Sequence, residues 1–516
     1  MRLAVIAAAV SAVVALTTSV HAQLLPPPVP AENPITEPKR ILGKMLFWDE
    51  QLSSNDTISC GGCHQPASGG ADVRISIHPG PDHVVPSADD IAGSQGVARI
   101  NVFGIPVSDP VFGLNPQVTS RAAPTVIGAA YATDNFLDGH ARTTFTNPET
   151  GTVSIVSGGG LESQAVNPFL SPVEMAHEGR TWNDVRLKLQ TILPLRDATD
   201  LPPDLDAVVA SHVTYPQLFA AAYGSTSITA ERIAFALATY ERTLVPDQTP
   251  WDRTMRGEAN GMTPIQKFGW DIFRVTPCQT CHAPPRFSDQ TFRNIGIRPI
   301  SDDIGRQAVT GSSADAGRFK VPTLRNVGLK PTHMHNGRIT TIRDAMLWYR
   351  IVNTDRFPQN LDPLLPITIQ TNAEDAVVDF LTNGLTDPRV AAETFPFDRP
   401  AIHRGKLPSL TMGSDKRTLS WPALMGIQRY SLYRGALADL RVLGPDGLPS
   451  MGYGACISTT DPNTADTTFV DLDVPDPGEG FFYLKGVIDG HGVERGLGAT
   501  SGGRAHFVIA SCPPPS

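Results

Sequence analysis

Two copies of one short cysteine motif constrain this chain more than any other feature of its sequence. CGGCH covers residues 60–64 and CQTCH covers residues 278–282, so two residues separate each pair of cysteines and a histidine follows directly. Histidine fills only 13 of the 516 positions, so chance would rarely place one after both pairs. A zinc site would need two pairs brought together or a nearby His-x3–5-His, and a thioredoxin-like centre would need one pair at a strand end. The sequence around the motifs supplies neither context.

Attachment of haem c is the interpretation that fits both motifs. In such a site the two thiols add to the vinyl groups of haem, and the adjacent histidine ligates the iron from the proximal side. We therefore expect two covalently bound haem c groups. Their predicted attachment and ligand residues are Cys60, Cys63 and His64 at the first motif, and Cys278, Cys281 and His282 at the second.

The first 22 residues have the layout of a cleavable secretory signal. They contain one basic residue near the start, a long apolar run and a small-residue end at Ala22. The run is short for a retained membrane anchor, and no later segment approaches the roughly 18 uninterrupted apolar residues that a span requires. We expect cleavage near Ala22 and a periplasmic or secreted mature chain, 23–516, without a transmembrane segment.

Composition and charge narrow the class of partner. The chain has 41% apolar and 18% charged residues, which is ordinary for a globular protein of several domains. Its formal net charge is -9, with no long run of either sign. An acidic surface disfavours nucleic acid and suits a basic or neutral protein partner, although solubility alone would also explain it.

The segments that follow the two motifs look like copies of one unit. PTVIGAAYATDNFLDG starts at Pro124 and PTLRNVGLKPTHMHNG starts at Pro322, and each leads from a Pro-Thr pair to an Asp-Gly or Asn-Gly pair over the same spacing. The first copy has about twenty extra residues between its motif and its Pro-Thr pair. The Pro-, Gly- and Ser-rich stretch 78–96 is the predicted insertion, and we expect a surface loop there. A second insertion is predicted within 146–160.

The predicted fold class is multidomain, with two mainly α cytochrome c-type domains in tandem followed by an all-β sandwich. Apolar residues recur at helical spacing in 228–244 and in 263–273. From about residue 415, short β-branched or aromatic runs are broken by Gly, Pro and Asp. We expect a signal peptide at 1–22 and domains at 23–245, 246–395 and 410–516. In the last, Cys456 and Cys512 are predicted to form a disulfide, with free buried thiols as the alternative.

Several motifs in register resemble the bacterial di-haem cytochrome c peroxidases and their MauG relatives, over roughly residues 35–390. They are ILGKMLFWDEQLSSNDTISCGGCHQPASGGADVRIS, RAAPTVIGAAYATDNFLDGHA, QAVNPFLSPVEM, ALATYERTLVPDQTPWDR, CQTCHAPPRFSDQTFRNIGI and GRFKVPTLRNVGLKPTHMHNG. The stretch around Trp421 and YSLYRG resembles a fibronectin type III module. The first resemblance implies a peroxidatic haem at His64 and an electron-relaying haem at His282.

The same resemblance implies the catalytic groups. A distal glutamate that moves a proton between the oxygen atoms of peroxide, assisted by a glutamine ten residues earlier, would be Glu174 with Gln164. The residues alone leave another role open for Glu174. Ser171, Pro172 and Glu174 also fit a helix capping box, with proline at the first helical position and glutamate at the third.

Thr341 and Asp344 predict the start of a helix, and helical spacing then brings Met346 and Tyr349 to one face. Packing in the core would explain the inward position of both residues. Members of the MauG type have tyrosine at the position of Tyr349, whereas ordinary peroxidases have methionine. The resemblance therefore implies Tyr349 as the sixth ligand of the second haem iron, with Met346 and Met334 as lesser candidates. An anionic phenolate would favour ferric iron, whereas methionine raises a haem potential.

The chain departs from the family pattern at three further places. Leu137 replaces the tryptophan that family members have between the haems. Ala122 replaces an asparagine that binds an inter-domain calcium, although the carbonyls of Lys330 and Thr332 could contribute, so calcium is possible but doubtful. His78 lies near the position of a loop histidine that caps the reactive iron in resting peroxidases, and a solvated loop histidine is the alternative.

The resemblance implies a peroxidase-type oxidoreductase that reduces hydrogen peroxide with electrons relayed between two haems. A small electron-donor protein, a cytochrome c or a cupredoxin, would be its partner. One alternative is a MauG-like oxidase that uses peroxide to oxidise a protein or organic substrate. Another is a non-enzymatic di-haem electron-transfer cytochrome, in which both irons would be six-coordinate.

Overall fold

The computed structural model describes most of the chain. The described residues are 24–74, 76–101, 107–113, 115–211, 213–350, 355–367, 371–402, 411–421, 427–439, 454–457, 468–476, 479–489 and 494–495. The predicted signal peptide 1–22 and Cys512 lie outside these ranges. Within them, no helix combines the length and the apolar character that crossing a membrane requires.

The first part of the chain is mainly helical, with three short strand pairs between the helices. Its helices are α2 (Glu37–Trp48), α3 (Cys60–Cys63), α4 (Gly160–Ala165), α5 (Trp182–Thr191), α6 (Pro203–Val209), α7 (Tyr215–Tyr223) and α8 (Ala230–Glu241), with 3-10 turns η1 (Glu50–Leu52), η2 (Pro66–Ser68), η3 (Ala129–Tyr131) and η4 (Pro168–Leu170). The strands are β1 (Ser76–His78), β2 (Ile91–Gly93), β3 (Gln95–Ala98), β4 (Pro116–Val118), β5 (Phe145–Thr146) and β6 (Val153–Ile155), paired β1–β2, β3–β4 and β5–β6.

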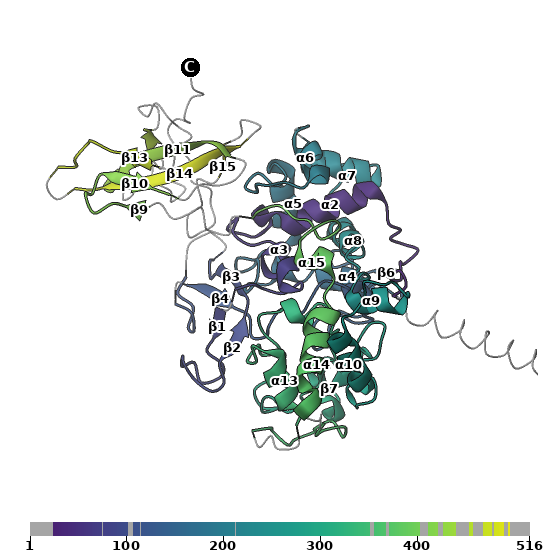
Figure 1. The fold of residues 1–516 in the computed structure, drawn as a ribbon. Coiled ribbons are helices and arrows are strands. Elements are labelled where there is room, and N and C mark those ends of the chain that lie inside the picture. The colour runs from purple at the N-terminus through teal and green to yellow at the C-terminus, as the bar shows by residue number, and fades with distance from the viewer. Residues whose placement is uncertain are drawn as a thin grey trace, which may run out of the picture.

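The second part, up to residue 402, is also helical. Its elements are α9 (Pro250–Met255), α10 (Pro264–Phe273), α11 (Cys278–Cys281), β7 (Phe292–Arg293), α12 (Gln307–Thr310), η5 (Ser313–Asp315), β8 (Phe319–Lys320), η6 (Val327–Leu329), α13 (Ile342–Trp348), η7 (Thr371–Ala373), α14 (Glu374–Asp379), the π-helical turn η8 (Phe380–Gly384) and α15 (Pro388–Ala391). In Figure 1, α10, α13 and α14 lie together below α2 and α5–α8. The helices predicted at 228–244 and 263–273 are confirmed as α8 and α10.

Each half is built on one close helix crossing. Helix α2 packs on α8, and α10 packs on α14, and these are the most extensive helix contacts of the described chain. A glycine lies at each crossing: a Cβ on Gly43 would be 1.9 Å from the carbonyl oxygen of Ala236, and one on Gly269 would be 2.0 Å from that of Ala376. Because only hydrogen fits there, both crossings require glycine. The equivalent crossings show that the two halves share one helical plan.

The repeat predicted from the Pro-Thr pairs is present in the backbone. An isolated antiparallel bridge joins Asn135 to Ala141, and another joins His333 to Ile339, 198 positions later in both members. The short turns η3 and η6 precede these bridges at the same offset. The internal repeat is therefore structural as well as sequential.

The two predicted insertions form hairpins rather than simple loops. Stretch 78–96 begins in β1 and returns in β2, which pair antiparallel with His78 opposite Ile91. Its middle, 81–86, is exposed, so the predicted surface position is confirmed. The second insertion forms the hairpin of β5 and β6.

An ionic junction joins the two halves. The guanidinium of Arg121 donates to both carboxylate oxygens of Asp303, at 2.8 and 2.7 Å, and to Asp138 at 2.7 Å. Arg306 of the second half donates to Asp134 at 2.9 Å. These partly buried pairs hold the Pro-Thr unit of the first half against the second half.

The last described part of the chain consists of strands in two sheets. One sheet has the order β13–β10–β9 and the other β12–β11–β14–β15. Their bounds are β9 (Thr411–Met412), β10 (Thr418–Ser420), β11 (Ile427–Ala436), β12 (Ala455–Cys456), β13 (Thr468–Val470), β14 (Phe481–Asp489) and β15 (Glu494–Arg495). Buried residues of both sheets, among them Leu419, Trp421 and Leu432, form one cluster. The strands lie apart from the helices at the upper left of Figure 1. Cys456 is disulfide-bonded, as predicted.

The two glycine crossings generate a stability prediction. Gly43→Ala and Gly269→Ala should each lower the free energy of unfolding by about 1–3 kcal/mol, since the added methyl group must displace a helix carbonyl. Lys267→Ala, an exposed change on α10, should stay within about 0.5 kcal/mol of the parent. Chemical denaturation of the holoprotein measures all three. Equal stability of the glycine variants and the parent would show that the crossings can separate at no cost.

Candidate functional site

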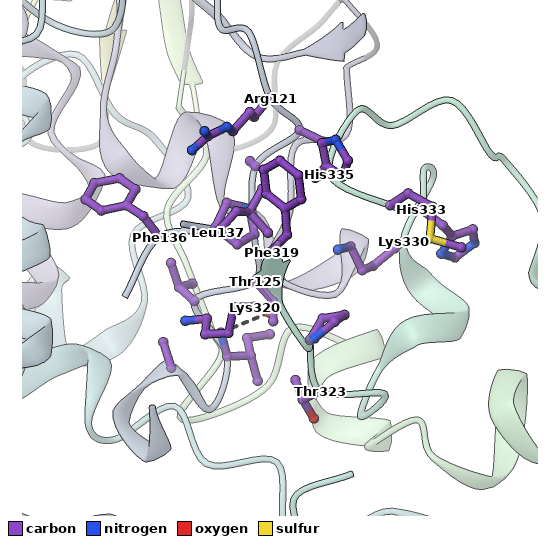
Figure 2. Close-up of a pocket in the computed structure, with 18 of the residues that line it drawn as sticks. Arg121, Thr125, Phe136, Leu137, Phe319, Lys320, Thr323, Lys330, His333 and His335 are labelled. Carbon is purple, nitrogen blue, oxygen red and sulfur yellow. Dashed lines mark hydrogen bonds between the residues drawn. The ribbon is translucent and has the colours of Figure 1, made fainter. Parts of the chain in front are cut away.

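One cavity of about 500 Å³ contains both cysteine motifs. Cys60, Cys63 and His64 line it from the first half, and Cys278, Cys281 and His282 line it from the second. Figure 2 shows the middle of this cavity, where Leu137, Phe319 and His335 lie between the two halves. The fold therefore brings together two motifs that are more than two hundred residues apart.

Each motif starts a single helical turn that ends at the histidine. At α3 the side chain of Ser59 accepts a hydrogen bond from the Gly62 amide at 3.2 Å, which caps the turn. The histidine amides donate to the carbonyl of the first cysteine, His64 to Cys60 at 3.1 Å and His282 to Cys278 at 2.9 Å. This places both thiols and the imidazole of each motif on one short turn.

Backbone carbonyls orient the two histidine rings. Nδ1 of His64 lies 3.1 Å from the Gly70 carbonyl oxygen. Nδ1 of His282 lies 3.1 Å from the Pro322 carbonyl oxygen and 3.2 Å from that of Phe287. Burial lowers the pKa of both histidines, so both rings are neutral near pH 7. With Nδ1 bonded to the backbone, Nε2 is the nitrogen that can ligate a metal.

The four motif cysteines are free thiols rather than disulfides. Burial raises the pKa of Cys60, of Cys63 and of Cys278, and it raises the pKa of Cys281 to about 11. Two partly buried thiols that form no disulfide, beside a neutral histidine and open to the cavity, fit the donor set of haem c at both motifs. Bound haem, held by the two cysteines and the histidine of each motif, would supply redox chemistry at iron.

Glu174 and Gln164 both line the cavity on the side of the first motif. Burial raises the pKa of Glu174, and a hydrogen bond with the Ser171 side chain partly opposes that shift. Residues 172–175 form a turn, and the next helix, α5, begins only at Trp182 with its own cap at Thr181. The interpretation of Glu174 as a helix cap is therefore wrong, because no helix begins at that turn.

Contacts from three other segments fix the turn that carries Glu174. A Cβ on Gly96 would lie 1.7 Å from the Val173 carbonyl oxygen, so only glycine allows β3 to approach so closely. The side-chain amide of Gln117 donates to the Pro172 carbonyl at 2.8 Å. Buried Arg180 donates to the Met175 carbonyl at 3.2 Å and to the Leu52 carbonyl at 2.7 Å. The carboxyl group thus projects from a rigid turn.

Tyr349 ends α13 and lines the cavity on the side of the second motif. The predicted cap is confirmed, since the Thr341 hydroxyl accepts from the Asp344 amide at 3.0 Å. Burial raises the pKa of Tyr349, the Cys281 and Cys278 thiols add to the shift, and the positive charge of Arg356 opposes it. Met346 is buried in the core cluster of the second half, and it lines the cavity together with Met334.

An aromatic pair lies where the family tryptophan is missing. Leu137 lines the cavity, and close to it the rings of Phe319 and His335 stack with centroids 3.7 Å apart (Figure 2). The guanidinium of Arg121 lies 5.3 Å from the centroid of the Phe319 ring. His335 occupies in the second copy the position that Leu137 occupies in the first. The repeat in the sequence already aligned His335 with Leu137, but only the folded structure shows that His335 stacks on Phe319.

His78 is not among the residues that line the cavity. Its Nδ1 accepts from the Gly80 amide at 3.1 Å, and its ring packs edge-on against Phe112 at 5.5 Å between centroids. Ala122 and Thr332 line a small separate pocket with Asp72 and Arg74. Since Arg74 donates to Asp72 at 2.6 Å there, the carboxylate already has a cationic partner.

Two residues line the cavity with side chains to which the sequence analysis assigned no role. Glu241 ends α8, is buried, and has a pKa raised to about 8 by burial. Lys330 follows η6, and burial lowers its pKa to about 8. Glu241 lies inside the quoted ALATYERTL motif, so helical periodicity could have placed it near the buried face, but periodicity does not reveal a cavity.

Two similar helical halves share one cavity, and each contributes one Cys-x-x-Cys-His motif to it. A family model described as di-haem cytochrome c peroxidase matches residues 37–260. This part of the chain is therefore similar to the di-haem cytochrome c peroxidases.

Curated proteins and one solved structure are similar to this chain. The chain is 29% identical to a cytochrome c peroxidase of Escherichia coli (strain K12), over 63% of this chain and 56% of that protein. It is 28% identical to the methylamine utilization protein MauG of Methylorubrum extorquens, over 72% of this chain and 84% of that protein. A crystal structure of a MauG-like protein associated with microbial copper homeostasis has a TM-score of 0.51 and 22% identity, over 73% of this chain and 96% of that one, and shows the fold.

Glu241 should make stability depend on pH. Its pKa is raised from 4.5 to about 8, so the folded state keeps a proton that the unfolded state releases. The contribution to stability is therefore present below about pH 4.5 and is lost as the pH rises toward 8, at about 1.4 kcal/mol per unit. Glu241→Gln should unfold at a higher temperature than the parent near pH 8 and at a similar temperature near pH 5.

The exposed residue Glu178 provides the control for this measurement. Glu178→Gln should leave the difference between the two pH values as in the parent. Thermal unfolding of the holoprotein followed by circular dichroism gives the comparison. A Glu241→Gln variant with the same pH profile as the parent would mean that Glu241 ionises normally in the folded protein.

Proposed function

We propose that this protein is a di-haem c peroxidase that reduces hydrogen peroxide to water, with electrons relayed from the haem at His282 to the haem at His64. The observation that carries the proposal is the single cavity that contains both motifs and also Glu174. Two electrons and two protons convert one peroxide to two waters. The electrons come from a small donor protein, a cytochrome c or a cupredoxin.

Glu174 acts as the acid–base group. A carboxylate can take the proton from one oxygen of peroxide and deliver it to the other, which makes water the leaving group. The raised pKa of Glu174 suits this task, because both protonation states are then accessible nearer to neutral pH. Gln164, at the end of α4 and on the same cavity wall, is placed to orient peroxide through its side-chain amide.

Tyr349 is the proposed ligand of the second haem iron. Its position beside the thiols of the second motif supports this role. Met346 and Met334 are the other candidate ligands. Phenolate ligation would favour the MauG-like alternative, in which peroxide oxidises a protein or organic substrate, since the second iron would then be stabilised in oxidised states.

We further infer the organisation that accompanies this function. The haem domains are 23–245 and 246–395, and 410–516 is a fibronectin type III-like sandwich in which Cys456 pairs with Cys512. Export with cleavage near Ala22 places the mature protein in the periplasm or outside the cell, where haem c proteins and disulfides are compatible. Calcium stays possible but doubtful, since Asp72 in the pocket beside Ala122 and Thr332 is already paired with Arg74.

Glu174→Gln should keep the fold and both haems but lose peroxide turnover by roughly a hundredfold or more, the usual scale for a missing acid–base group. Denaturing mass spectrometry must first show the mature chain plus two haem masses in variant and parent. Initial rates and melting temperature are then measured on one sample. Glu178→Gln, an exposed change four residues away, should retain parent activity. Full turnover by Glu174→Gln would remove Glu174 from the mechanism.

Tyr349→Met should raise the midpoint potential of the second haem, because a neutral thioether replaces an anionic donor. Tyr349→Phe should open that iron to small ligands such as cyanide. Spectroelectrochemical titration and ligand binding measure the two effects, and Met346→Leu should leave both close to the parent. If the tyrosine variants keep the parent spectrum and potentials, the ligand is Met346 or Met334 and Tyr349 is a core residue.

A further inference from the structure

Five lysine and arginine side chains line the cavity, and four of them have anionic or carbonyl partners. Arg121 is paired with Asp303 and Asp138, Arg293 with Asp289 and Asp362, and Arg350 with Glu374, and Lys320 donates to the Asp134 carbonyl at 3.0 Å. The fifth is Lys330. No acceptor for its ammonium group is found among the residues that the structure describes.

Lys330 is held so that its charge faces the cavity. Its side chain leaves the chain just after η6 and runs past Gly69, where an added Cβ would lie 3.1 Å from the Lys330 Cγ. Figure 2 shows its nitrogen end pointing into the cavity toward Phe319. Gly69 follows the first motif closely in the chain, so the Lys330 side chain lies on the side of that motif.

An unpaired ammonium group in this position is costly. Removing a charge from water without a partner costs several kcal/mol, so such groups are normally paired or neutral. Burial alone lowers the pKa of Lys330, and no carboxylate of the described chain raises it again. The missing partner is therefore expected to be an anion that enters the cavity with the molecule that fills it.

We propose that Lys330 is the counter-ion of a propionate of the haem attached at Cys60 and Cys63. This inference depends on the proposed haem attachment. Each haem carries two propionates, which are carboxylates at neutral pH, and the thioether links fix the macrocycle so that these groups stay in a defined place. A charge-assisted hydrogen bond from the ammonium to a propionate would satisfy both ions.

The pairing has a redox consequence. An unpaired propionate places negative charge beside the iron and stabilises the ferric state, so a lysine that offsets this charge raises the midpoint potential. Lys330 thus tunes the first haem without contact with iron, as a positioning and charge-balancing residue. Loss of its charge should lower the potential of the haem at His64 more than that of the haem at His282.

The test compares Lys330→Met, Lys330→Gln and Lys330→Arg in the holoprotein. Mass spectrometry first establishes two haems per chain. Redox titration should then show a lower potential of the first haem for Met and Gln and a near-parent value for Arg, which keeps the charge. Resonance Raman spectra should show a shifted propionate bending band for Met and Gln only. Lys267→Met, an exposed change on α10, should leave both measurements at parent values.

Other outcomes are decisive in different ways. Unchanged potential and propionate band in a two-haem Lys330→Gln protein would overturn the Lys330 proposal and leave the peroxidase proposal intact. A parent protein without covalent haem would overturn the proposed function itself. A parent potential that follows chloride concentration at constant ionic strength would assign the counter-ion to solvent instead of propionate, and so contradict the proposal.

Discussion

The bond from each motif histidine to a backbone carbonyl is the interaction on which the rest of the site depends. Nδ1 of His64 is bonded to the Gly70 carbonyl and Nδ1 of His282 to the Pro322 carbonyl, which leaves Nε2 of each ring to ligate a metal. The first Pro-Thr turn lies against the segment that follows its motif, since Thr125 donates to the Gly69 carbonyl at 2.7 Å. The chain between motif and turn therefore folds back on itself.

The shared cavity follows from the way in which the Pro-Thr units of the two halves meet. Arg121, just before the first turn, binds Asp303 of the second half, and the Ala122 amide donates to the His335 carbonyl at 2.8 Å. The Pro-Thr unit of one half is thus bonded to that of the other. Any shift at this junction would move both prospective haems relative to each other, and electron transfer depends steeply on their separation. The ion pairs at the junction therefore fix the separation of the two prospective haems and also stabilise the fold.

The departures from the family pattern are concentrated in the same region. Leu137 removes an oxidisable side chain, while Phe319 stacked on His335 keeps aromatic atoms between the motifs. Lys330 and Tyr349 line the same cavity, and no acceptor for the Lys330 ammonium group is found among the described residues. The helix crossings at Gly43 and Gly269 are equivalent. The two halves therefore share one architecture and differ in the side chains that they present to the cavity.

The sequence by itself determined the haem motifs, the internal repeat and the main helices, because covalent attachment and apolar periodicity depend on neighbouring residues. It also brought out Glu174, Gln164 and Tyr349 through the family resemblance. The tertiary structure decided which residues face the cavity and which of them lie on turns, because spacing along the sequence does not show this. It showed that Glu174 lies on a turn rather than at a helix start, that Glu241 and Lys330 face the cavity, and that His78 does not. Such facts depend on contacts between segments far apart in the chain, and burial, which sets the pKa of Glu241 and Lys330, arises only when those segments pack.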